Sequence, residues 1–457
     1  MNRMLKKLDR VFNPKSIAVV GASAIPAKVG NVVLKNFIDG GYSGKIYPVN
    51  PKYETLLGFR CYKTIKDTND RIDCVIIATP APTVPSIIKE CGEMDAGGVV
   101  VLSGGFEEAG RKDLAEEIKR YANKYELPVI GPNCLGVYDT YTRVDSIFFP
   151  FYKMERPKPG AISFITQSGA VGSTVIDLAA YYGIGMAKFI SYGNATVLDE
   201  GELLEYLEKD RQTKIIVLYL EGTKNGKTLL RTLKRVNQKK PIIVLKAGKY
   251  GKALEAAKSH TGNLAGDYMA YQAVFKQTKV TEAEDIDELF DFVKIFNQTL
   301  PKGNRIGVIT NGGGLGVLTT DAIEKEGLQM AELSESTKST LKGIMPAYGT
   351  ISNPLDIIAD ATVELYEKSI ETFMNDQKID ALIVVVLTQA PPIDERIIGV
   401  LTRASDDKRK PVAVIAVGGA YTQTYKKALE SRGVPTYDSA QSAVKALKRF
   451  VNYAESR

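Results

Sequence analysis

The chain contains a single histidine, His260, and its surroundings favour covalent chemistry over metal binding. It lies in the polar, glycine-containing segment 258–266, between two stretches with helical periodicity, and this pattern predicts an exposed loop. The chain has no second histidine, and none of its cysteine pairs has the spacing of a metal site. We therefore predict no metal ligands. A lone histidine is commonly a structural or surface residue. On such a loop an imidazole can also act as a general acid or base, or as the nucleophile that forms a phosphohistidine.

A carboxylate can orient the imidazole of such a histidine, and Glu221 is the candidate for this role. It follows an apolar run in the sequence Leu-Tyr-Leu-Glu-Gly, which predicts a position at the end of a strand. A glutamate at a strand end is also commonly a solvated charge, so the pattern leaves both roles open.

Three glycine-rich turns each follow an apolar run and precede a helical pattern. Backbone N–H groups at a helix N-terminus bind anions, and glycine lets a phosphate approach them closely. The second and third turns would share one phosphate if their helix N-termini faced each other, although tight packing alone also requires glycine there. The predicted phosphate-binding residues are Gln167, Ser168 and Gly169 in the second turn, and Asn311, Gly312, Gly313 and Gly314 in the third.

The first turn, residues 21–30, does not match the GxGxxG fingerprint of dinucleotide-binding domains. After the next apolar run, where an NAD-binding domain places an acidic residue, the chain has Asn50-Pro51-Lys52. A lysine at this place suits a phosphorylated ribose, as in NADP or in the 3′-phospho-ADP part of CoA. A plain tight turn with a solvated lysine is the alternative.

The elements that must position these residues alternate short apolar runs with amphipathic stretches, which predicts βα units and parallel sheets. At 457 residues the chain is too long for one core. We therefore predict an α/β protein of three doubly wound parallel-sheet domains. They cover residues 1–137, 159–299 and 300–457, with a Pro- and aromatic-rich linker at 138–158. The last two domains open with the same strand, glycine turn and helix pattern, which indicates a structural repeat.

Composition excludes several classes of protein. No apolar run reaches the ~18 residues of a membrane span. The first 12 residues are basic and amphipathic but lack the apolar core of a signal peptide, so we expect a short surface helix and a cytoplasmic protein. The net charge of +7 is scattered, and we predict no nucleic-acid surface. The cysteines Cys61, Cys74, Cys91 and Cys134 have no CxxC spacing and are expected to be buried and reduced.

Together these motifs resemble the NDP-forming acyl-CoA synthetases, the superfamily of succinyl-CoA synthetase. The resemblance is strongest to the α subunit of archaeal-type ADP-forming acetate–CoA ligases and runs along essentially the whole chain. The motifs GAS, VNPKY, TPAP, SGGFEE and GPNCLG are similar to the CoA-binding domain, while QSGAVG, SYGN, YLEG and SHTGNLAG are similar to the central ligase domain. NGGGLG opens the third domain. The resemblance thus implies a Rossmann-like CoA-binding domain and two flavodoxin-like ligase domains.

The resemblance also implies a reaction. Acyl-CoA and phosphate would give an acyl phosphate and CoA, and His260 would take the phosphoryl group and pass it to ADP. Glu221 would hold His260, while the turns at Ser168 and Gly313 would cradle the phosphate. The residues that map onto the CoA-binding motifs are Gly21, Ser23, Lys28, Asn50, Pro51, Lys52, Pro80, Pro82, Ser103 and Asn133.

The family's ATP-grasp module, which binds ATP and Mg²⁺, does not follow residue 457, and no GxxxxGK[ST] motif replaces it. The resemblance therefore implies a separate ATP-grasp β subunit in an α₂β₂ heterotetramer. CoA or acetyl-CoA, phosphate and ADP or ATP would be the ligands, with nucleotide and Mg²⁺ mainly on the partner. Two other interpretations are an NADP-dependent oxidoreductase and a non-catalytic CoA-binding subunit. The oxidoreductase interpretation leaves the second and third glycine turns without a role. The interpretation as a non-catalytic subunit disregards the intact motifs around His260 and Glu221.

Overall fold

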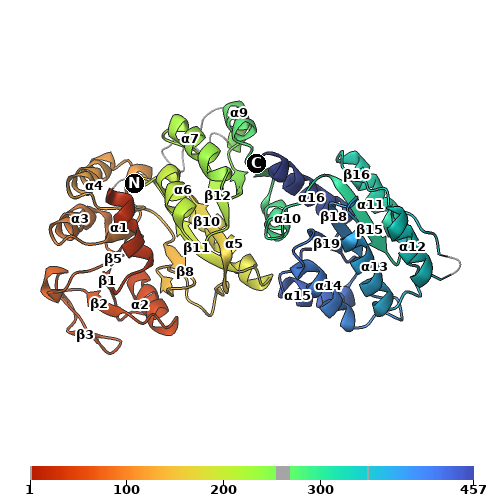
Figure 1. Ribbon diagram of the computed structural model, residues 1–457. Helices are drawn as coiled ribbons and strands as arrows, with labels where there is room; N and C mark the ends of the chain where they lie inside the picture. Colours follow the sequence, from red (N-terminus) through yellow and green to blue (C-terminus); the bar gives the residue numbers. More distant parts are fainter. Residues whose placement is uncertain (1–2, 254–267, 347–348) are drawn as a thin grey trace. The chain divides into compact units, whose positions relative to one another are not determined.

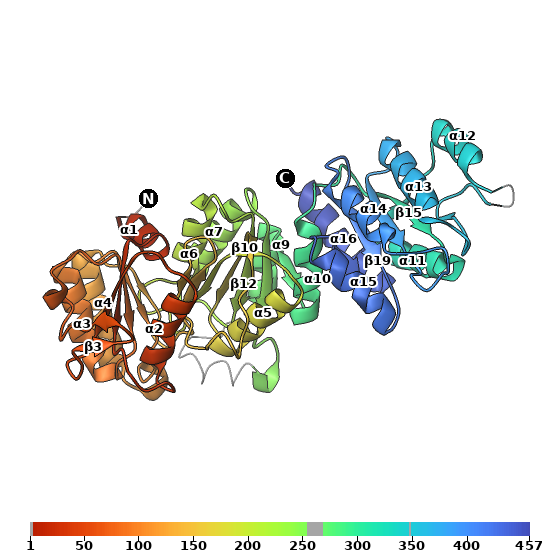
Figure 2. The same cartoon turned by 90° about the horizontal axis from the view of Figure 1, so that it is seen from below.

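The computed structural model describes residues 3–253, 268–346 and 349–457. The chain forms two compact units (Figures 1 and 2). The first comprises Met1–Tyr181 and Gly185–Glu282, and the second comprises Tyr182–Ile184 and Ala283–Arg457. The main sheets are all mostly parallel, as the sequence predicts for an α/β protein. The predicted boundaries of three domains stay a prediction, because the first two sheets pack into one unit.

The first sheet is doubly wound, with helices on both faces (Figure 1). Its parallel strands are, in order, β2 (Lys45–Val49), β1 (Ser16–Val20), β5 (Cys74–Ile77), β6 (Gly98–Val101) and β7 (Val129–Ile130). Its helices are α1 (Arg3–Phe12), α2 (Val29–Asp39), α3 (Val84–Glu93) and α4 (Lys112–Tyr125). A two-stranded ribbon of β3 (Thr55–Leu56) and β4 (Phe59–Arg60) lies beside it.

Alternate residues of the first sheet enter different cores. Ile17 and Ile76 pack in the core that contains α1 and α2, whereas Ala18 and Val75 pack in the core that contains α3 and α4. This two-sided burial explains the continuous apolar runs in the sequence. The helix α1 is more deeply packed than the expected surface helix, because its residues Leu5, Leu8, Val11 and Phe12 are at most 2% exposed.

The second sheet has seven strands. They are, in order, β14 (Thr281–Ala283), β13 (Ile242–Lys246), β12 (Ile215–Leu220), β10 (Pro159–Thr166), β11 (Met186–Ser191), β8 (Val137–Asp139) and β9 (Val144–Asp145). Its helices include α5 (Gly169–Tyr181), α6 (Glu200–Lys209), α7 (Gly226–Asn237) and α9 (Tyr268–Thr278). The strands from β10 to β13 are parallel, whereas β8 and β9 add an antiparallel edge.

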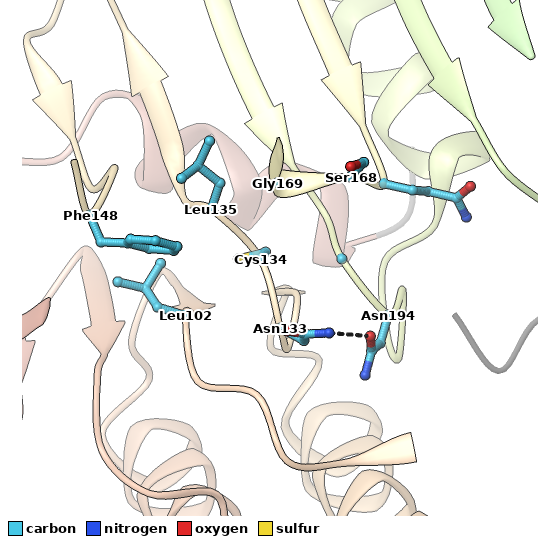
Figure 3. Close-up of a pocket in the computed structure, with 10 residues that line it drawn as sticks. Leu102, Asn133, Cys134, Leu135, Phe148, Ser168, Gly169 and Asn194 are labelled. Carbon is cyan, nitrogen blue, oxygen red and sulfur yellow. Dashed lines mark hydrogen bonds between the residues drawn. The ribbon is translucent and has the colours of Figure 1, made fainter. Parts of the chain in front are cut away.

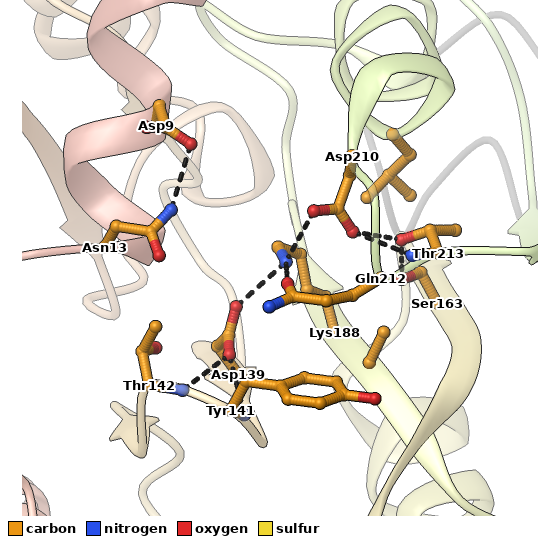
Figure 4. A network of polar contacts seen from close by, with 12 residues as sticks. Asp9, Asn13, Asp139, Tyr141, Thr142, Ser163, Lys188, Asp210, Gln212 and Thr213 are labelled. Atoms are coloured by element: carbon orange, nitrogen blue, oxygen red, sulfur yellow. Dashed lines mark hydrogen bonds and ion pairs between the residues drawn. The ribbon is translucent and has the colours of Figure 1, made fainter.

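Residues 138–158, predicted to be a linker, therefore contain part of β8 and all of β9. Buried charges fix this edge to the second sheet (Figure 4). Lys188 Nζ on β11 lies 3.0 Å from Asp139 Oδ2 on β8 and 3.0 Å from Asp210 Oδ1 after α6. Arg156 pairs with Asp145 on β9 at 2.8 Å. Because a buried charge is costly without its partner, these pairs restrict where the edge strands can lie.

The third sheet lies in the second unit and is parallel. Its strands are β16 (Gln329–Met330), β15 (Arg305–Thr310), β18 (Ala381–Val385), β19 (Val412–Ile415) and β20 (Thr436–Tyr437), with β17 (Leu355–Asp356) also beside β15. Its helices are α10 (Ile286–Phe296), α11 (Gly313–Lys325), α12 (Glu335–Ile344), α13 (Val363–Asn375), α14 (Arg396–Asp406), α15 (Ala420–Glu430) and α16 (Ala440–Glu455). Among the described residues, no helix is both long and apolar enough to span a membrane.

The second and third sheets have the same hydrogen-bond pattern at the ends of β10 and β15. The hydroxyl of Thr166, the last residue of β10, donates to the carbonyl of Ser168 and accepts from its N–H. Thr310 at the end of β15 makes the same two bonds with Gly312. A Cβ at Gly172 or Gly316 would meet the Cγ2 of the corresponding threonine at 3.0 and 2.9 Å. Both turns thus begin their helix in close contact with the strand, which matches the repeat seen in the sequence.

Candidate functional site

The residues predicted to hold CoA all follow strands of the first sheet, at its carboxyl edge. In open α/β sheets ligands bind at this edge, near the point where the strand order reverses. Gly21 and Ser23 follow β1, and Lys28 lies further along the same connection, just before α2. Residues 50–52 follow β2, and the remaining residues follow β5, β6 and β7. The fold therefore brings together residues that are up to 112 positions apart, from Gly21 to Asn133.

Hydrogen bonds join these turns to one another. Asn50 Nδ2 donates to the carbonyl of Ala22 at 2.7 Å, which ties the turn after β2 to the turn after β1. Ser103 Oγ donates to the carbonyl of Thr79 at 2.5 Å, and the N–H of Asn133 donates to the carbonyl of Ser103 at 2.8 Å. The turns after β1 and β2 are thus joined to each other, and so are the turns after β5, β6 and β7.

The exposed side chains of this edge are the ones free to approach a ligand. Lys28, Pro51 and Lys52 are exposed, as are Pro80 and Pro82. By contrast, Ser23 is buried, and its Oγ accepts a hydrogen bond from the N–H of Ile25 at 3.1 Å. The N–H of Lys52 donates to Asn50 Oδ1 at 3.0 Å, an Asx turn that fixes the backbone from which the lysine projects.

A cavity of about 140 Å³ lies where this edge meets the glycine turn of the second sheet (Figure 3). Its polar wall comes from three separate motifs and consists of Asn133, Gln167, Ser168, Gly169, Gly193 and Asn194. Its apolar wall consists of Leu102, Cys134, Leu135 and Phe148. The site thus has a polar end beside Ser168 and an apolar end beside Phe148 (Figure 3).

Ser168 stands at the N-terminus of α5. Its Oγ accepts a hydrogen bond from the N–H of Val171 at 3.3 Å, as an N-cap residue does. The first turn of α5 begins at Gly169, so its backbone N–H groups lie at the polar end of the cavity. A helix N-terminus carries a partial positive charge, and this arrangement suits a phosphate or another oxyanion.

The side chain of Gln167, predicted to bind phosphate, also links two strand ends. Its Oε1 accepts hydrogen bonds from the N–H groups of Glu221 and Gly222 at 2.5 and 3.0 Å, and its Nε2 donates to the carbonyl of Gly222 at 2.8 Å. The amide therefore joins the end of β10 to the end of β12. These two strands flank the point where the strand order reverses, so Gln167 positions Glu221 at the switch point of the sheet.

Glu221 is buried at the end of β12. Its Oε1 accepts a hydrogen bond from the hydroxyl of Tyr219 at 3.2 Å, and its carbonyl accepts one from Lys246 Nζ at 2.8 Å. Burial lowers the pKa of Lys246 to about 8, against an opposing effect of the Glu221 charge. His260, the predicted nucleophile, lies outside the described residues, so its contact with Glu221 stays a prediction.

Glu108 and Asn194, which the sequence analysis did not single out, support the polar wall. Glu108 Oε1 accepts hydrogen bonds from the N–H groups of Gly105 and Phe106, and its Oε2 accepts one from Asn194 Nδ2 at 2.5 Å. Asn194 Oδ1 in turn accepts one from Asn133 Nδ2 at 3.2 Å (Figure 3). The signal in the sequence was the pair of motifs SGGFEE and SYGN, whose individual residues only the fold brings together.

Burial alone would raise the pKa of Glu108. The hydrogen bonds from Gly105 and from the amide of Asn194 outweigh this effect and lower the pKa below its ordinary value. An ionised carboxylate accepts hydrogen bonds only, so Asn194 must turn its amide nitrogen toward Glu108 and its oxygen toward Asn133. The orientation of both asparagines at the cavity is thereby determined.

The thiol in the cavity is not a nucleophile. Burial raises the pKa of Cys134 to about 12, and its Sγ donates to the carbonyl of Val101 at 3.2 Å. A thiolate is the reactive form, so Cys134 is inert near neutral pH. All four cysteines are free and buried, as the sequence analysis expects. Within the described residues, no group of histidine, cysteine, aspartate and glutamate side chains is arranged to hold a metal ion.

The third glycine turn belongs to the second unit. Asn311 corresponds to Gln167, because its Oδ1 accepts from the N–H of Leu387 at 2.8 Å and its Nδ2 donates to the carbonyl of Leu387 at 3.2 Å. Gly313 and Gly314 are exposed. A Cβ at Gly313 would lie 2.6 Å from Asp356 Oδ2. The carboxyl group of Asp356 therefore lies beside the N-terminus of α11.

Comparison with known proteins finds three domain families along the chain. Residues 15–140 match the CoA binding domain, residues 159–296 match the succinyl-CoA ligase like flavodoxin domain, and residues 306–447 match the Ligase-CoA domain. The cavity beside Ser168 is lined from the first two of these regions and from the segment between them.

Two curated relatives are similar over nearly the whole chain. The α subunit of acetate–CoA ligase [ADP-forming] II from Pyrococcus furiosus is 38% identical over 455 residues, which cover 98% of both chains. Acetate–CoA ligase [ADP-forming] from Methanocaldococcus jannaschii is 39% identical over 453 residues. That alignment covers 98% of this chain but 63% of the M. jannaschii protein, so the chain spans less than two thirds of that relative.

A solved structure is similar along the whole chain. The dinucleotide-forming acetyl-coenzyme A synthetase 1 of Ca. Korarchaeum cryptofilum, in complex with phosphate and ADP, aligns with a TM-score of 0.92 and 34% sequence identity. The alignment covers 100% of this chain and 98% of that chain.

Proposed function

The chain belongs to the family of ADP-forming acetate–CoA ligases, and from this premise we propose that it is the CoA-binding, phosphohistidine-carrying α subunit of such a ligase. It interconverts acyl-CoA, ADP and phosphate with a carboxylic acid, CoA and ATP. The proposal rests above all on the cavity that joins the predicted CoA edge of the first sheet to the helix N-terminus at Ser168.

The first step of the proposed reaction takes place in this cavity. Acyl-CoA binds along the carboxyl edge of the first sheet, with Lys52 and Lys28 near its phosphates and its thioester beside Asn133. Phosphate binds at the first turn of α5 and at the Ser168 hydroxyl. A phosphate oxygen attacks the thioester carbonyl carbon, the C–S bond breaks, and CoA leaves as acyl phosphate forms. The helix N-terminus lowers the energy of the negative charge that develops on the carbonyl oxygen.

The second step transfers the phosphoryl group to His260. A ring nitrogen attacks phosphorus, the bond between phosphorus and the acyl oxygen breaks, and the carboxylic acid is released. Glu221 holds the other ring nitrogen and stabilises the imidazolium form. Its position at the end of β12, fixed by Gln167, supports this role. The glycine turn at residues 311–314 stays part of the proposed phosphate site.

ADP then receives the phosphoryl group on a partner chain. We propose that this partner is an ATP-grasp β subunit that binds nucleotide and Mg²⁺, that the two form an α₂β₂ assembly, and that it works in the cytoplasm. The M. jannaschii relative supports this, because its single chain contains an additional third that this chain does not match.

Phosphorylation of His260 tests the proposal directly. The chain is incubated with its β partner, Mg²⁺ and γ-labelled ATP, beside the variants His260→Ala and Glu221→Gln. We expect acid-labile, base-stable label on the wild type, none on His260→Ala, and slower labelling of Glu221→Gln. A wild-type chain that takes no label from an active partner would contradict the mechanism and leave the non-catalytic CoA-binding subunit as the interpretation.

A further inference from the structure

Lys246 is a buried lysine at the end of β13, beside the strand end that carries Glu221. It is 2% exposed, and its Nζ donates to the carbonyl of Glu221 at 2.8 Å and to the carbonyl of Ala247. The same Nζ lies 4.7 Å from the centre of the Tyr271 ring on α9, which is a cation–π contact. The ammonium group is therefore held between two strand ends and a helix.

Two other buried lysines hold the ends of helices. Lys240 Nζ donates to the carbonyls of Leu207 and Asp210 at the end of α6, both at 2.6 Å. Lys410 Nζ donates in the same way to two carbonyls at the end of α13. A cation is favourable at a helix C-terminus, which explains both lysines. The carbonyls that Lys246 meets lie at strand ends, so this explanation does not apply to it.

The third sheet shows that the fold does not require a lysine at this place. In both sheets an N–H of one strand donates to the carbonyl of the proline that precedes its neighbour, so β12 and β13 correspond in register to β18 and β19. The counterparts of Glu221 and Lys246 are then Leu387 and Ala416. Both counterparts are apolar. Of these two strand pairs, only the one that carries Glu221 has a carboxylate and a cation at its end.

The charge of Lys246 acts mainly on Glu221. In the described part of the chain, the ammonium group faces the carboxylates of Glu221 on β12 and Glu282 on β14, and the cation of Lys249. Lys249 Nζ pairs with Glu282 Oε1 at 3.0 Å, so the effects of these two charges on Lys246 largely cancel. A neighbouring cation favours the ionised form of a carboxylate. Lys246 therefore favours an ionised Glu221.

We propose that Lys246 is a positioning residue for the phosphoryl transfer, which fixes the backbone of Glu221 and keeps its carboxylate ionised. This role rests on the proposed function, because Lys246 acts through the carboxylate that holds His260. An ionised carboxylate accepts the N–H of the imidazole and stabilises the positive charge that develops on the ring while its other nitrogen attacks phosphorus. Burial lowers the pKa of Lys246 to about 8, so the support is lost as the pH rises above this value.

The test measures how fast His260 takes label from inorganic phosphate and acetyl-CoA. The complex with the β partner and Mg²⁺ is used without nucleotide, at about pH 7 and pH 9. Lys246→Met removes the cation, whereas Lys246→Arg keeps a cation that does not titrate in this range. Lys410→Met is the matched control, because it removes a buried cation that also donates to two carbonyls and whose pKa burial also lowers to about 8, but in the second unit.

At pH 7 we expect Lys246→Met to take label about tenfold more slowly than the wild type, and Lys410→Met to match the wild type. Between pH 7 and pH 9 the rate should fall in the wild type and in Lys410→Met, but not in Lys246→Arg. In a Glu221→Gln background Lys246→Met should have little further effect, because the carboxylate through which it acts is gone. A merely structural effect would lower the rate equally in both backgrounds.

Three results would each overturn the role of Lys246: a wild-type rate in Lys246→Met, an equal loss in Lys410→Met, or losses from Lys246→Met and Glu221→Gln that simply multiply. If Lys246→Met does not fold, as judged by urea unfolding, Lys246→Arg decides, and a rate that still falls between pH 7 and pH 9 would overturn the role. A wild-type chain that takes no label contradicts the proposed function itself, and the role of Lys246 fails with it.

Discussion

Glu108 lies outside the cavity, yet it decides which atoms two lining residues present. Its carboxylate accepts from the amide of Asn194, and Asn194 then accepts from Asn133. An amide at position 108 can offer either a donor or an acceptor, so the orientation of both asparagines would no longer be unique. Under the proposed function, Glu108 would be a positioning residue that acts on the substrate through Asn194 and Asn133.

We expect Glu108→Gln to lower kcat for acetyl-CoA about tenfold with little change in KM, because a misplaced donor affects the reacting group more than the rest of CoA. Steady-state kinetics of the complex would measure both constants. Glu117→Gln is the matched control, since Glu117 lies on α4, pairs with Arg120 at 3.1 Å and takes no part in this network. A similar loss of kcat in both variants would rule out the positioning role.

Glu200 gives the first unit a pH dependence. Burial, followed by the nearby charge of Asp199, raises its pKa from 4.5 to about 7 in the folded chain. Between these pH values the folded state keeps a proton that the unfolded state releases. The contribution of Glu200 to the free energy of unfolding is therefore fully present below pH 4.5 and is lost as the pH rises through 7.

Glu200→Gln removes this titration. We expect the wild type to lose about 3 kcal/mol of unfolding free energy between pH 4.5 and 7 through this group, and the variant to lose little. Urea unfolding at pH 5 and pH 8 would show the difference, with Glu205→Gln on the same helix as the control. Parallel pH profiles of Glu200→Gln and the wild type would show that Glu200 is ionised in the fold.

At the scale of elements, the site depends on two loops that touch through their backbones. Gly193, between β11 and α6, has a φ of +50°, and a Cβ there would lie 2.3 Å from the carbonyl oxygens of Pro132 and Asn133. The loop that carries Asn194 can therefore meet the loop that carries Asn133 only because residue 193 has no side chain.

We expect Gly193→Ala to destabilise the first unit by about 3 kcal/mol or more, because both the backbone conformation and the contact become strained. The thermal unfolding midpoint would fall by roughly 6 °C or more. Gly226→Ala is the control, since a Cβ at this first residue of α7 meets open space. If both variants unfold like the wild type, the two loops can separate without cost.

The glycine turns show how far an element can be read from the sequence. The patterns QSGAVG and NGGGLG predicted a strand, a turn and a helix, and the structure has β10 followed by α5 and β15 followed by α11. They did not predict that the amides of Gln167 and Asn311 would bind neighbouring strand ends. Strand order decides which loop lies next to a turn, and it depends on pairing between distant segments.

At the scale of the whole molecule, the predicted CoA edge and the cavity belong to one compact unit. We therefore expect CoA alone to stabilise this chain without any partner. At a hundred times its Kd, a ligand that binds only the folded state adds about 2.7 kcal/mol, which corresponds to a rise of roughly 5 °C in Tm. Calorimetry of the chain with CoA or NADPH would measure this.

Lys52→Ala should reduce the effect of CoA, because it removes the cation predicted to meet the 3′-phosphate, while Lys35→Ala on the exposed face of α2 should not. Stabilisation by NADPH in place of CoA would favour the oxidoreductase interpretation. Stabilisation by neither would contradict CoA binding by the isolated chain.

The sequence by itself determined the α/β class, the parallel sheets, the position of each glycine turn and, through its motifs, the family. These features depend on local patterns, because apolar periodicity and turn residues act within a few positions of one another. It also indicated Glu221 and Asn133 as site residues, and both lie where strands end.

Only the tertiary structure decided what surrounds them. The predicted linker supplies two edge strands and Phe148, Glu108 reaches the cavity through Asn194, and Asp356 stands beside the third turn. None of these neighbours is close in the sequence. Their proximity results from strand order and from buried charges such as Lys188 with Asp139, and such contacts form only when the sheets pack together.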